Sequence, residues 1–184
     1  MKNKELLEVE QEEYQLKTKH GYNFDEVASA LQKSIRRGME REAAFWGVEL
    51  FTSYWKYVFN RLVVIAAEDI DDPQILQTVV STANWVNELK KPPDVVIVVK
   101  LILIMVRARK NREADELANL VLMDMEEGKL LNMPDWAIDK HTKRGKELGR
   151  DLKFFWEDGA KLDNPLPSKY RDELYERLGY KKPE

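Results

Sequence analysis

The chain has 184 residues, of which 43% are hydrophobic and 34% charged, and its formal net charge is −3. This length fits one domain or two small ones, and the apolar fraction is high enough for a packed core, so we expect a soluble globular protein. The absence of cysteine excludes a disulfide framework and a cysteine nucleophile, and it fits a cytoplasmic protein. The negative charge means that any contact with nucleic acid must use a local basic patch.

The sequence divides into three expected regions. Residues 1–20 are rich in Lys and Glu, and we expect a peripheral segment there rather than a secretory signal. Residues 21–132 are expected to form a helical core domain, and residues 133–184 a basic and aromatic tail packed on that core. The most apolar stretch, residues 95–106, contains Lys100 and is shorter than the roughly 20 residues of a membrane-spanning helix, so we predict no membrane partner.

The first clear helix signal is the pair Asn23 and Glu26, whose spacing predicts a capping box at the start of a helix. Gly38 is expected to end that helix, because glycine adopts the left-handed conformation that follows many helices. A second helix should begin near Met39, where small residues among aromatic ones favour close helix approach. A third is expected over residues 54–70.

Pro73 predicts the start of the next helix, with the preceding aspartates as caps, and residues 90–93 end it. The run of Val, Ile and Leu over residues 95–106 has the composition of a buried strand as well as of a buried helix. We predict a helix capped by Asp94, because the run continues past ordinary strand length and no second strand candidate exists to pair with it.

A further amphipathic helix is predicted over residues 112–127, stopped by Gly128. The tail should then contain a turn around Trp136, a basic helix from about Thr142 and a last helix over residues 168–178. The expected fold class is therefore all-α, a compact helical domain with a polar C-terminal tail.

Four short segments carry a resemblance to a known family. They are Ala30-Leu31-Gln32-Lys33-Ser34-Ile35-Arg36, Glu42-Ala43-Ala44, Arg61-Leu62-Val63-Val64-Ile65-Ala66-Ala67-Glu68-Asp69-Ile70 and Thr142-Lys143-Arg144-Gly145-Lys146-Glu147-Leu148-Gly149. From about Tyr22 to Gly149 the chain resembles the C-terminal domain of the MgsA/RarA replication-associated recombination AAA+ ATPases, relatives of the Werner helicase-interacting protein. It departs from the family at Asp71, where glycine is usual, at Lys110-Asn111, and in the aromatic content of residues 150–184.

The resemblance implies an all-helical, clamp-loader-like domain that forms tetramers and belongs to an ATPase of stalled or damaged replication forks. No segment has the Gly-x-x-x-x-Gly-Lys-Ser/Thr spacing of a phosphate-binding loop, and the nearest string, residues 145–151, lacks the hydroxyl residue after lysine. We therefore expect no enzyme activity and no cofactor. The expected function is oligomerisation and interaction in DNA replication, recombination or repair, as a homo-oligomer or with an AAA+ ATPase or another replication protein.

A basic segment in the tail gives the alternative function, a nucleic-acid-binding accessory protein, because local positive charge contacts phosphates and aromatic rings stack on bases. The candidate DNA-contacting residues are Lys140, Lys143, Arg144, Lys146, Arg150 and Lys153, followed by Phe154, Phe155 and Trp156. A solvated basic face beside a structural aromatic anchor is the competing interpretation, and the overall negative charge favours it.

The remaining polar groups favour structural roles. The acidic cluster Glu68, Asp69, Asp71 and Asp72 lacks the alternation and glycine of a calcium loop, so helix capping is the simpler interpretation and no metal is predicted. His20 and His141 are far apart in sequence and are interpreted as incidental. The large aromatic residues are expected in the core or in a subunit interface: Phe45, Trp46, Phe51, Trp55, Phe59 and Trp85.

Overall fold

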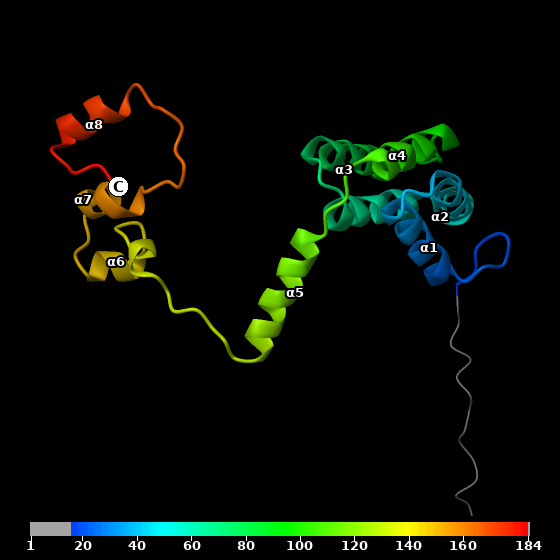
Figure 1. Ribbon diagram of the computed structural model, residues 1–184, viewed down its shortest axis with the longest axis horizontal. Coiled ribbons are helices and arrows are strands. Elements are labelled where there is room, and N and C mark those ends of the chain that lie inside the picture. Colours follow the sequence, from blue (N-terminus) through cyan, green and yellow to red (C-terminus); the bar gives the residue numbers. More distant parts are fainter. Residues whose placement is uncertain (1–15, 184) are drawn as a thin grey trace, which may run out of the picture. The chain divides into compact units, whose positions relative to one another are not determined.

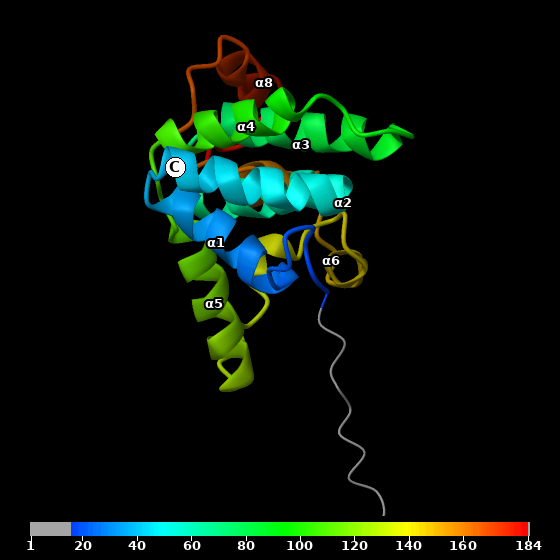
Figure 2. The ribbon, with the colours of Figure 1, turned by 90° about the vertical axis from the view of Figure 1, so that its right-hand side faces the viewer.

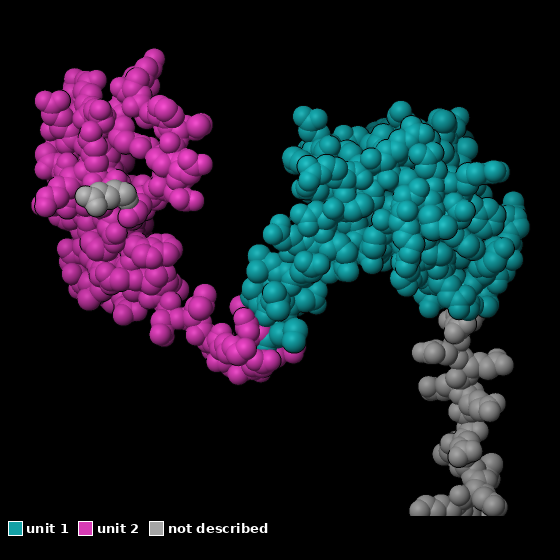
Figure 3. Space-filling model, viewed as in Figure 1, with its two compact units in different colours: residues 1–123 teal, residues 124–184 magenta. Residues whose placement is uncertain are grey.

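A computed structural model describes residues 16–183 of the chain (Figure 1). Residues 1–15 of the predicted peripheral segment therefore lie outside the described residues. The chain divides after Met123 into two compact units (Figure 3). Apart from two isolated bridges, every regular element in the described part is helical, which confirms the predicted all-α fold class. Among the same residues, no helix has the length and apolar character needed to cross a membrane.

The first unit is built around one long helix. Its elements are α1 (Phe24–Arg36), α2 (Glu40–Asp69), α3 (Pro73–Glu88), α4 (Val95–Arg107) and α5 (Glu113–Glu126), whose last residues lie beyond the division after Met123. Helix α2 lies at the centre, and α1, α3 and α4 pack against it (Figures 1 and 2). The core between them is fully buried and contains Leu31, Ile35, Leu50, Phe59, Leu62, Ile65, Val79, Val86, Ile102 and Met105.

The sequence predicted two helices where the structure has the single helix α2. Tyr54 is its one residue with non-helical dihedrals, at φ −142° and ψ 58°. Residues 17–23, which we call the N-terminal turn, are hydrogen-bonded to α2 beside this kink. The Tyr54 hydroxyl donates to the Lys17 carbonyl at 2.8 Å, and the Lys19 amide donates to Ser53 Oγ at 2.8 Å. The predicted boundary between two helices is therefore a kink within α2, and the N-terminal turn packs beside it. No loop separates the two parts of the helix.

Helices α2 and α4 approach closely at Gly47, as the small residues of that stretch predicted. A Cβ atom on Gly47 would lie 2.1 Å from Cδ1 of Ile102, which is fully buried on α4. Glycine is needed here for space rather than for an unusual backbone conformation. Residues 95–107 form a helix because this conformation buries Leu101 and Met105, which lie one turn apart, in the same core.

Two of the three predicted N-terminal caps are confirmed. The side chains of Asp72 and Asp94 accept hydrogen bonds from backbone amides in the first turns of α3 and α4, and Pro73 opens α3. The predicted capping box at Asn23 is wrong, because Asn23 makes no side-chain cap. Its Oδ1 instead accepts a hydrogen bond from Lys17 Nζ, so the side chain holds the N-terminal turn.

The second unit consists of short elements, among which the predicted turn, basic helix and last helix occur in the predicted order, while the helical turns over residues 152–159 were not predicted. They are a 3₁₀ turn η1 (Asp135–Ala137), α6 (Lys143–Glu147), α7 (Leu152–Phe154), a π-helical turn η2 (Phe155–Gly159) and α8 (Arg171–Leu178). Its small interior contains the buried Ile138 and Tyr175. The packing of residues 133–184 on the helical core stays a prediction.

Candidate interaction surfaces

Helix α5 contains no buried residue, although the sequence predicted it as part of the packed scaffold. Six of its large apolar side chains are exposed: Leu117, Leu120, Val121, Leu122, Met123 and Met125. Leu117 is 61% exposed and Met125 57% exposed. An apolar surface of this extent is uncommon on a protein that works alone and is typical of an interaction site.

The apolar residues of α5 form a continuous stripe with helical spacing. Ala114, Leu117, Ala118, Val121 and Met125 repeat at intervals of three or four residues and therefore share one face. The stripe continues into a shallow groove of the first unit. This groove is lined by Ala67, Ile70, Asp71, Asn111, Glu113, Ala114 and Leu117.

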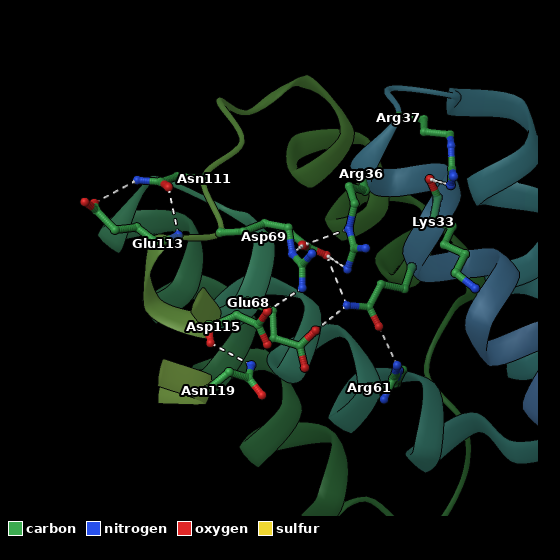
Figure 4. A network of polar contacts seen from close by, with 12 residues as sticks. Lys33, Arg36, Arg37, Arg61, Glu68, Asp69, Asn111, Glu113, Asp115 and Asn119 are labelled. Atoms are coloured by element: carbon green, nitrogen blue, oxygen red, sulfur yellow. Dashed lines mark hydrogen bonds and ion pairs between the residues drawn. The ribbon is translucent and has the colours of Figure 1, made fainter. Parts of the chain in front are cut away.

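A buried carboxylate lies at the base of α5 (Figure 4). Asp69, the last residue of α2, has no solvent exposure and accepts two hydrogen bonds from the Arg36 guanidinium, from Nε at 2.9 Å and from Nη2 at 3.2 Å. Arg112, just before α5, reaches the same carboxylate, with its Nε 3.4 Å from Oδ1. Asp69 thus joins the ends of α1 and α2 to the start of α5, and the arginine charges compensate its burial.

The buried amide of Gln32 extends this cluster along α2. Its Nε2 donates to Asp69 Oδ2 at 3.1 Å and to Glu68 Oε2 at 2.5 Å, while its Oε1 accepts a hydrogen bond from Arg61. These contacts use one face of α1 and one face of α2 (Figure 4). The residues that carry the family resemblance at 30–36 and 61–70 therefore meet in a single polar network.

The segment between α4 and α5 is fixed to α2 through its backbone. Ile70 and Lys110 form an antiparallel bridge, in which the Asp71 amide donates to the Arg109 carbonyl and the Asn111 amide to the Asp69 carbonyl, both at 3.1 Å. Two short extended stretches that are distant in sequence are thereby held side by side.

Lys110 closes the C-terminal end of α4. Its Nζ donates to the carbonyls of Met105 and Val106 at 2.9 Å and of Ala108 at 2.7 Å. A cation at this position also compensates the negative end of the helix dipole. Burial lowers the pKa of Lys110, and the negative charge of Asp69 opposes that shift.

Further contacts hold the first turn of α5 in place. Arg112 forms an ion pair with Asp115, and the Asn111 side chain accepts the Glu113 amide at 2.9 Å. Helix α5 is therefore held at its N-terminal end by ion pairs, a cap and a backbone bridge, while none of its own side chains is in the buried class. The anchoring at one end and the exposure along the stripe together make α5 the main candidate interaction element.

The basic candidates of the tail lie on short elements of the second unit. Lys143, Arg144 and Lys146 are exposed on α6, Lys153 is exposed on α7, and Lys140 is half-buried before α6. Lys143 lies 3.9 Å from Glu147 in an exposed pair that holds it only weakly. Four of the six candidate DNA-contacting residues are thus exposed to solvent and accessible to a ligand.

Arg150 differs from the other basic candidates because its guanidinium is engaged within the unit. Its side chain is only 17% exposed and pairs with Asp135 at 2.5 Å. It donates to the Ile138 carbonyl at 2.7 Å and lies 4.1 Å from the centre of the Phe154 ring. These contacts assign Arg150 a structural role.

The aromatic residues after the basic segment also form an anchor. Phe155 meets Trp156 edge to face with ring centres 5.2 Å apart, and Trp156 meets Tyr175 of α8 at 6.0 Å. The Tyr175 hydroxyl donates to the Trp156 carbonyl at 2.7 Å. The half-buried rings support the fold of the unit more directly than they support stacking on bases.

The segment from Thr142 to Gly149, which carries the family resemblance in the tail, is a compact turn. The Thr142 hydroxyl accepts the Gly145 amide and donates to the Asp139 carbonyl, both at 2.9 Å. A Cβ atom on Gly145 would lie 1.7 Å from that carbonyl oxygen, so no other residue fits. Hydrogen bonds from the His141 side chain and backbone lower the pKa of Asp139.

The acidic cluster and the histidines have partners within the chain. Asp69 faces arginines, Asp72 caps α3, and His20 Nδ1 lies 2.5 Å from Glu49 Oε2. Among residues 16–183, no three His, Cys, Asp or Glu side chains are grouped as metal ligands.

The large aromatic residues separate into a core set and a surface set. Phe59 is fully buried and Phe51, Trp46 and Trp55 pack against the core, whereas Phe45 is 51% exposed. Phe45, Trp46 and Tyr22 meet edge to face, with ring centres between 4.8 and 6.4 Å apart. We call these three residues the aromatic cluster.

The features described above are those of an all-helical domain with several exposed apolar and basic side chains. Residues 39–182 match the family described as MgsA AAA+ ATPase C terminal, and the chain belongs to this family, as the sequence predicted. It is also 27% identical over 162 residues to the Replication-associated recombination protein A of Bacillus subtilis (strain 168). That match covers 82% of this chain and 38% of the relative, so the chain spans well under half of the relative's length.

Proposed function

We propose that this chain is a non-catalytic assembly and interaction domain that works in DNA replication and recombination as a homo-oligomer. The observation that supports assembly most directly is the aromatic cluster, in which Tyr22 and Phe45 are exposed while Trp46 packs against the core of the helical unit. Aromatic residues are enriched at the centres of protein interfaces, where they bury a large area at low conformational cost. The tetramer is what the resemblance over residues 22–149 implies, and membership of a family of AAA+ ATPase C-terminal domains supports an AAA+ ATPase as partner.

The oligomeric state of the full chain tests this proposal. Light scattering coupled to size-exclusion chromatography should give a mass near four times 21.6 kDa. Phe45→Asp should reduce that mass, because a charge at the centre of an apolar interface is left unpaired. Asn84→Asp, a change at an exposed position on α3, serves as the control and should leave the mass unchanged. A monomer for the unmodified chain across the accessible concentration range would contradict the assembly proposal.

The non-catalytic part of the proposal has its own measurement. ATP hydrolysis by the purified chain should not exceed the buffer background, with or without DNA. Activity that follows the protein through purification would contradict it.

A second candidate function is DNA contact through the exposed cations of the tail. The observation that favours it is the accessibility of Lys143, Arg144, Lys146 and Lys153 around the short helix α6. Arg150 is left out, because its guanidinium is already paired. Each phosphate contact releases a counterion, so binding through this surface would weaken steeply with salt.

The test compares single- and double-stranded oligonucleotides in fluorescence anisotropy at increasing salt. The triple change Lys143→Glu, Arg144→Glu and Lys146→Glu should abolish binding and flatten its salt dependence. The matched control reverses three exposed cations elsewhere, Lys33→Glu, Arg37→Glu and Arg41→Glu. Equal loss in both variants would point to general electrostatics and overturn the assignment to α6.

A further inference from the structure

We propose that the N-terminal turn is a latch that Glu49 holds against α2, and that the closed latch places Tyr22 in the assembly surface. This inference rests on the proposed assembly through the aromatic cluster and adds a means of controlling it. When the turn leaves α2, Tyr22 leaves the cluster with it. The chain can thereby weaken its own assembly while the helical unit stays folded.

The N-terminal turn is closed by its own hydrogen bonds. Lys17 and Asn23 form an antiparallel bridge. Inside this bridge the Thr18 amide donates to the Tyr22 carbonyl and the Gly21 amide donates to the Thr18 carbonyl, both at 2.9 Å. Gly21 has φ +85°, a left-handed conformation that glycine adopts without strain. Tyr22 therefore follows any displacement of the turn.

The carboxylate of Glu49 holds the tip of the turn. Its Oε1 accepts the His20 amide at 3.1 Å, and its Oε2 lies 2.5 Å from His20 Nδ1. The Thr18 hydroxyl adds a hydrogen bond to the same carboxylate. Only 3% of Glu49 is exposed, and a buried carboxylate is stable where donors surround it. Both oxygens of this side chain are thus used to hold the turn.

The rings of the aromatic cluster lie one helical turn from Glu49. Phe45 and Trp46 precede it on α2 by four and three residues, so the carboxylate and both rings share one face of the helix. Tyr22 is the one ring of the cluster that α2 does not carry. Its ring centre lies 5.4 Å from that of Trp46 and 6.4 Å from that of Phe45. Only the bound position of the turn therefore completes the cluster.

The turn is held mainly by polar contacts. Of residues 17–23 only Thr18 is buried, and the exposed ones are Lys17, Lys19, His20, Gly21 and Tyr22. Segments with few buried apolar contacts open locally at a much lower free energy than the core unfolds. An open turn also exposes Glu49 to water, which replaces the lost donors. Opening therefore leaves no unpaired buried charge behind.

The experiment compares variants of the full chain in two measurements, hydrogen exchange over residues 17–23 and the concentration dependence of the oligomer in light scattering. Glu49→Ala should speed exchange in the turn and raise the dissociation constant of the oligomer, each by at least about ten-fold, because hydrogen bonds to a charged group are lost. Exchange over α3 and α4 should stay as in the unmodified chain. Glu88→Ala, which removes an exposed carboxylate at the end of α3, is the matched control and should change neither measurement.

Two further variants keep the test informative if Glu49→Ala disturbs the helix. His20→Ala changes a side chain that is 63% exposed and removes only the ring contact, so it should raise both quantities less than Glu49→Ala does. Glu49→Gln keeps an oxygen that can accept the His20 amide. It should restore part of the protection in the turn and part of the assembly.

Two outcomes overturn the latch alone. Exchange in the turn can stay slow in Glu49→Ala, which would mean that Glu49 does not hold it. The turn can also open while the oligomer stays as tight as before, which would mean that assembly does not need Tyr22. In both cases Phe45→Asp still dissociates the oligomer, so the assembly function survives. A monomeric unmodified chain overturns both proposals, and a parallel loss of protection and assembly supports both.

Discussion

The carboxylate of Asp69 and the guanidinium of Arg36 form a two-point contact, at 2.9 and 3.2 Å, across 33 residues of sequence. The contact closes α1 against the far end of α2, and Arg112 adds the root of α5 to the same carboxylate. One fully buried aspartate therefore connects three helices. Because a guanidinium and a carboxylate match in planar geometry, the arrangement fixes orientation as well as charge.

Asp69→Ala should destabilise the first unit by about 3 kcal/mol, because it leaves two arginines without their shared counterion. The lower end of the usual range applies, since the Arg36 and Arg112 side chains keep 29% and 40% of their exposure. Urea unfolding followed by far-ultraviolet circular dichroism measures the change. Asp71→Asn removes a neighbouring carboxylate that lies 4.0 Å from an exposed arginine, and it should cost less than about 1 kcal/mol. Similar losses in the two variants would rule out a special role for Asp69.

Glu49 should contribute acid sensitivity to the N-terminal turn. Burial alone would raise the pKa of Glu49, but hydrogen bonds from Thr18 and His20 outweigh burial and bring the pKa below 4.5. A carboxyl with a lowered folded pKa stabilises the protein above its unfolded pKa, and that stability is lost as pH falls through the folded pKa. The free energy of unfolding should therefore fall below pH 4.5, and Glu49→Gln should reduce this slope. An unchanged slope in the variant would place the acid sensitivity elsewhere.

Gly145→Ala should destabilise the second unit, because the new methyl group would overlap the Asp139 carbonyl, which belongs to the backbone and cannot rotate away. We expect a loss of roughly 1–3 kcal/mol, as for other overpacked sites. Hydrogen exchange should increase over residues 135–159 more than over α1 to α4. Lys146→Ala, an exposed change on the same short helix, is the control, and equal exchange in the two variants would contradict the steric argument.

Asp72→Ala should cost about 1 kcal/mol, the usual contribution of an N-terminal cap. The Asp72 side chain accepts the amides of Gln74 at 2.9 Å and Ile75 at 3.2 Å. Thermal unfolding should show a lower midpoint for this variant, whereas Asp72→Asn should remain close to the original because asparagine caps equally well. A loss in Asp72→Asn as large as in Asp72→Ala would indicate that charge rather than capping matters.

Most of the fold follows from local sequence signals. Pro73, Asp94 and Gly128 marked helix ends correctly, because each acts through its own backbone or through its nearest amides. The same locality explains the failure at Asn23. The capping signal was present, but Lys17, brought close by the N-terminal turn, takes the side-chain oxygen that the cap needs.

The polar network around Asp69 was beyond the reach of the sequence. Asp69 was grouped with its acidic neighbours as a capping cluster, although its partners Arg36 and Arg112 lie 33 residues before it and 43 residues after it. No periodicity links such positions, since the packing of α1 on α2 brings Arg36 to Asp69 and the bridge between Ile70 and Lys110 brings Arg112 there. The ion pairs of Asp69 therefore appear only in the structure, whereas the sequence suggested capping or metal binding for the cluster.

The exposure of α5 was missed for a different reason. An amphipathic pattern shows that one face is apolar, but it does not show what covers that face. Two signals were available: Leu120 and Met123 lie off the stripe, and the helix has acidic residues with no basic ones. Both features are unusual for a helix packed on its own core.

The six acidic residues over positions 113–127 outnumber the two cations paired with them, Arg112 and Lys129, and this excess charge makes the behaviour of the chain depend on its ionic surroundings. At about 0.1 M salt, charges are screened beyond roughly 10 Å, so the carboxylates of two approaching helices still repel each other at contact distance. At about 1 M salt that distance shrinks to roughly 3 Å, and the exposed leucines are no longer protected from one another. Concentrated salt would thus bring about the pairing of α5 helices that the acidic residues otherwise prevent, and the native solubility of this surface would be a property of charge rather than of burial.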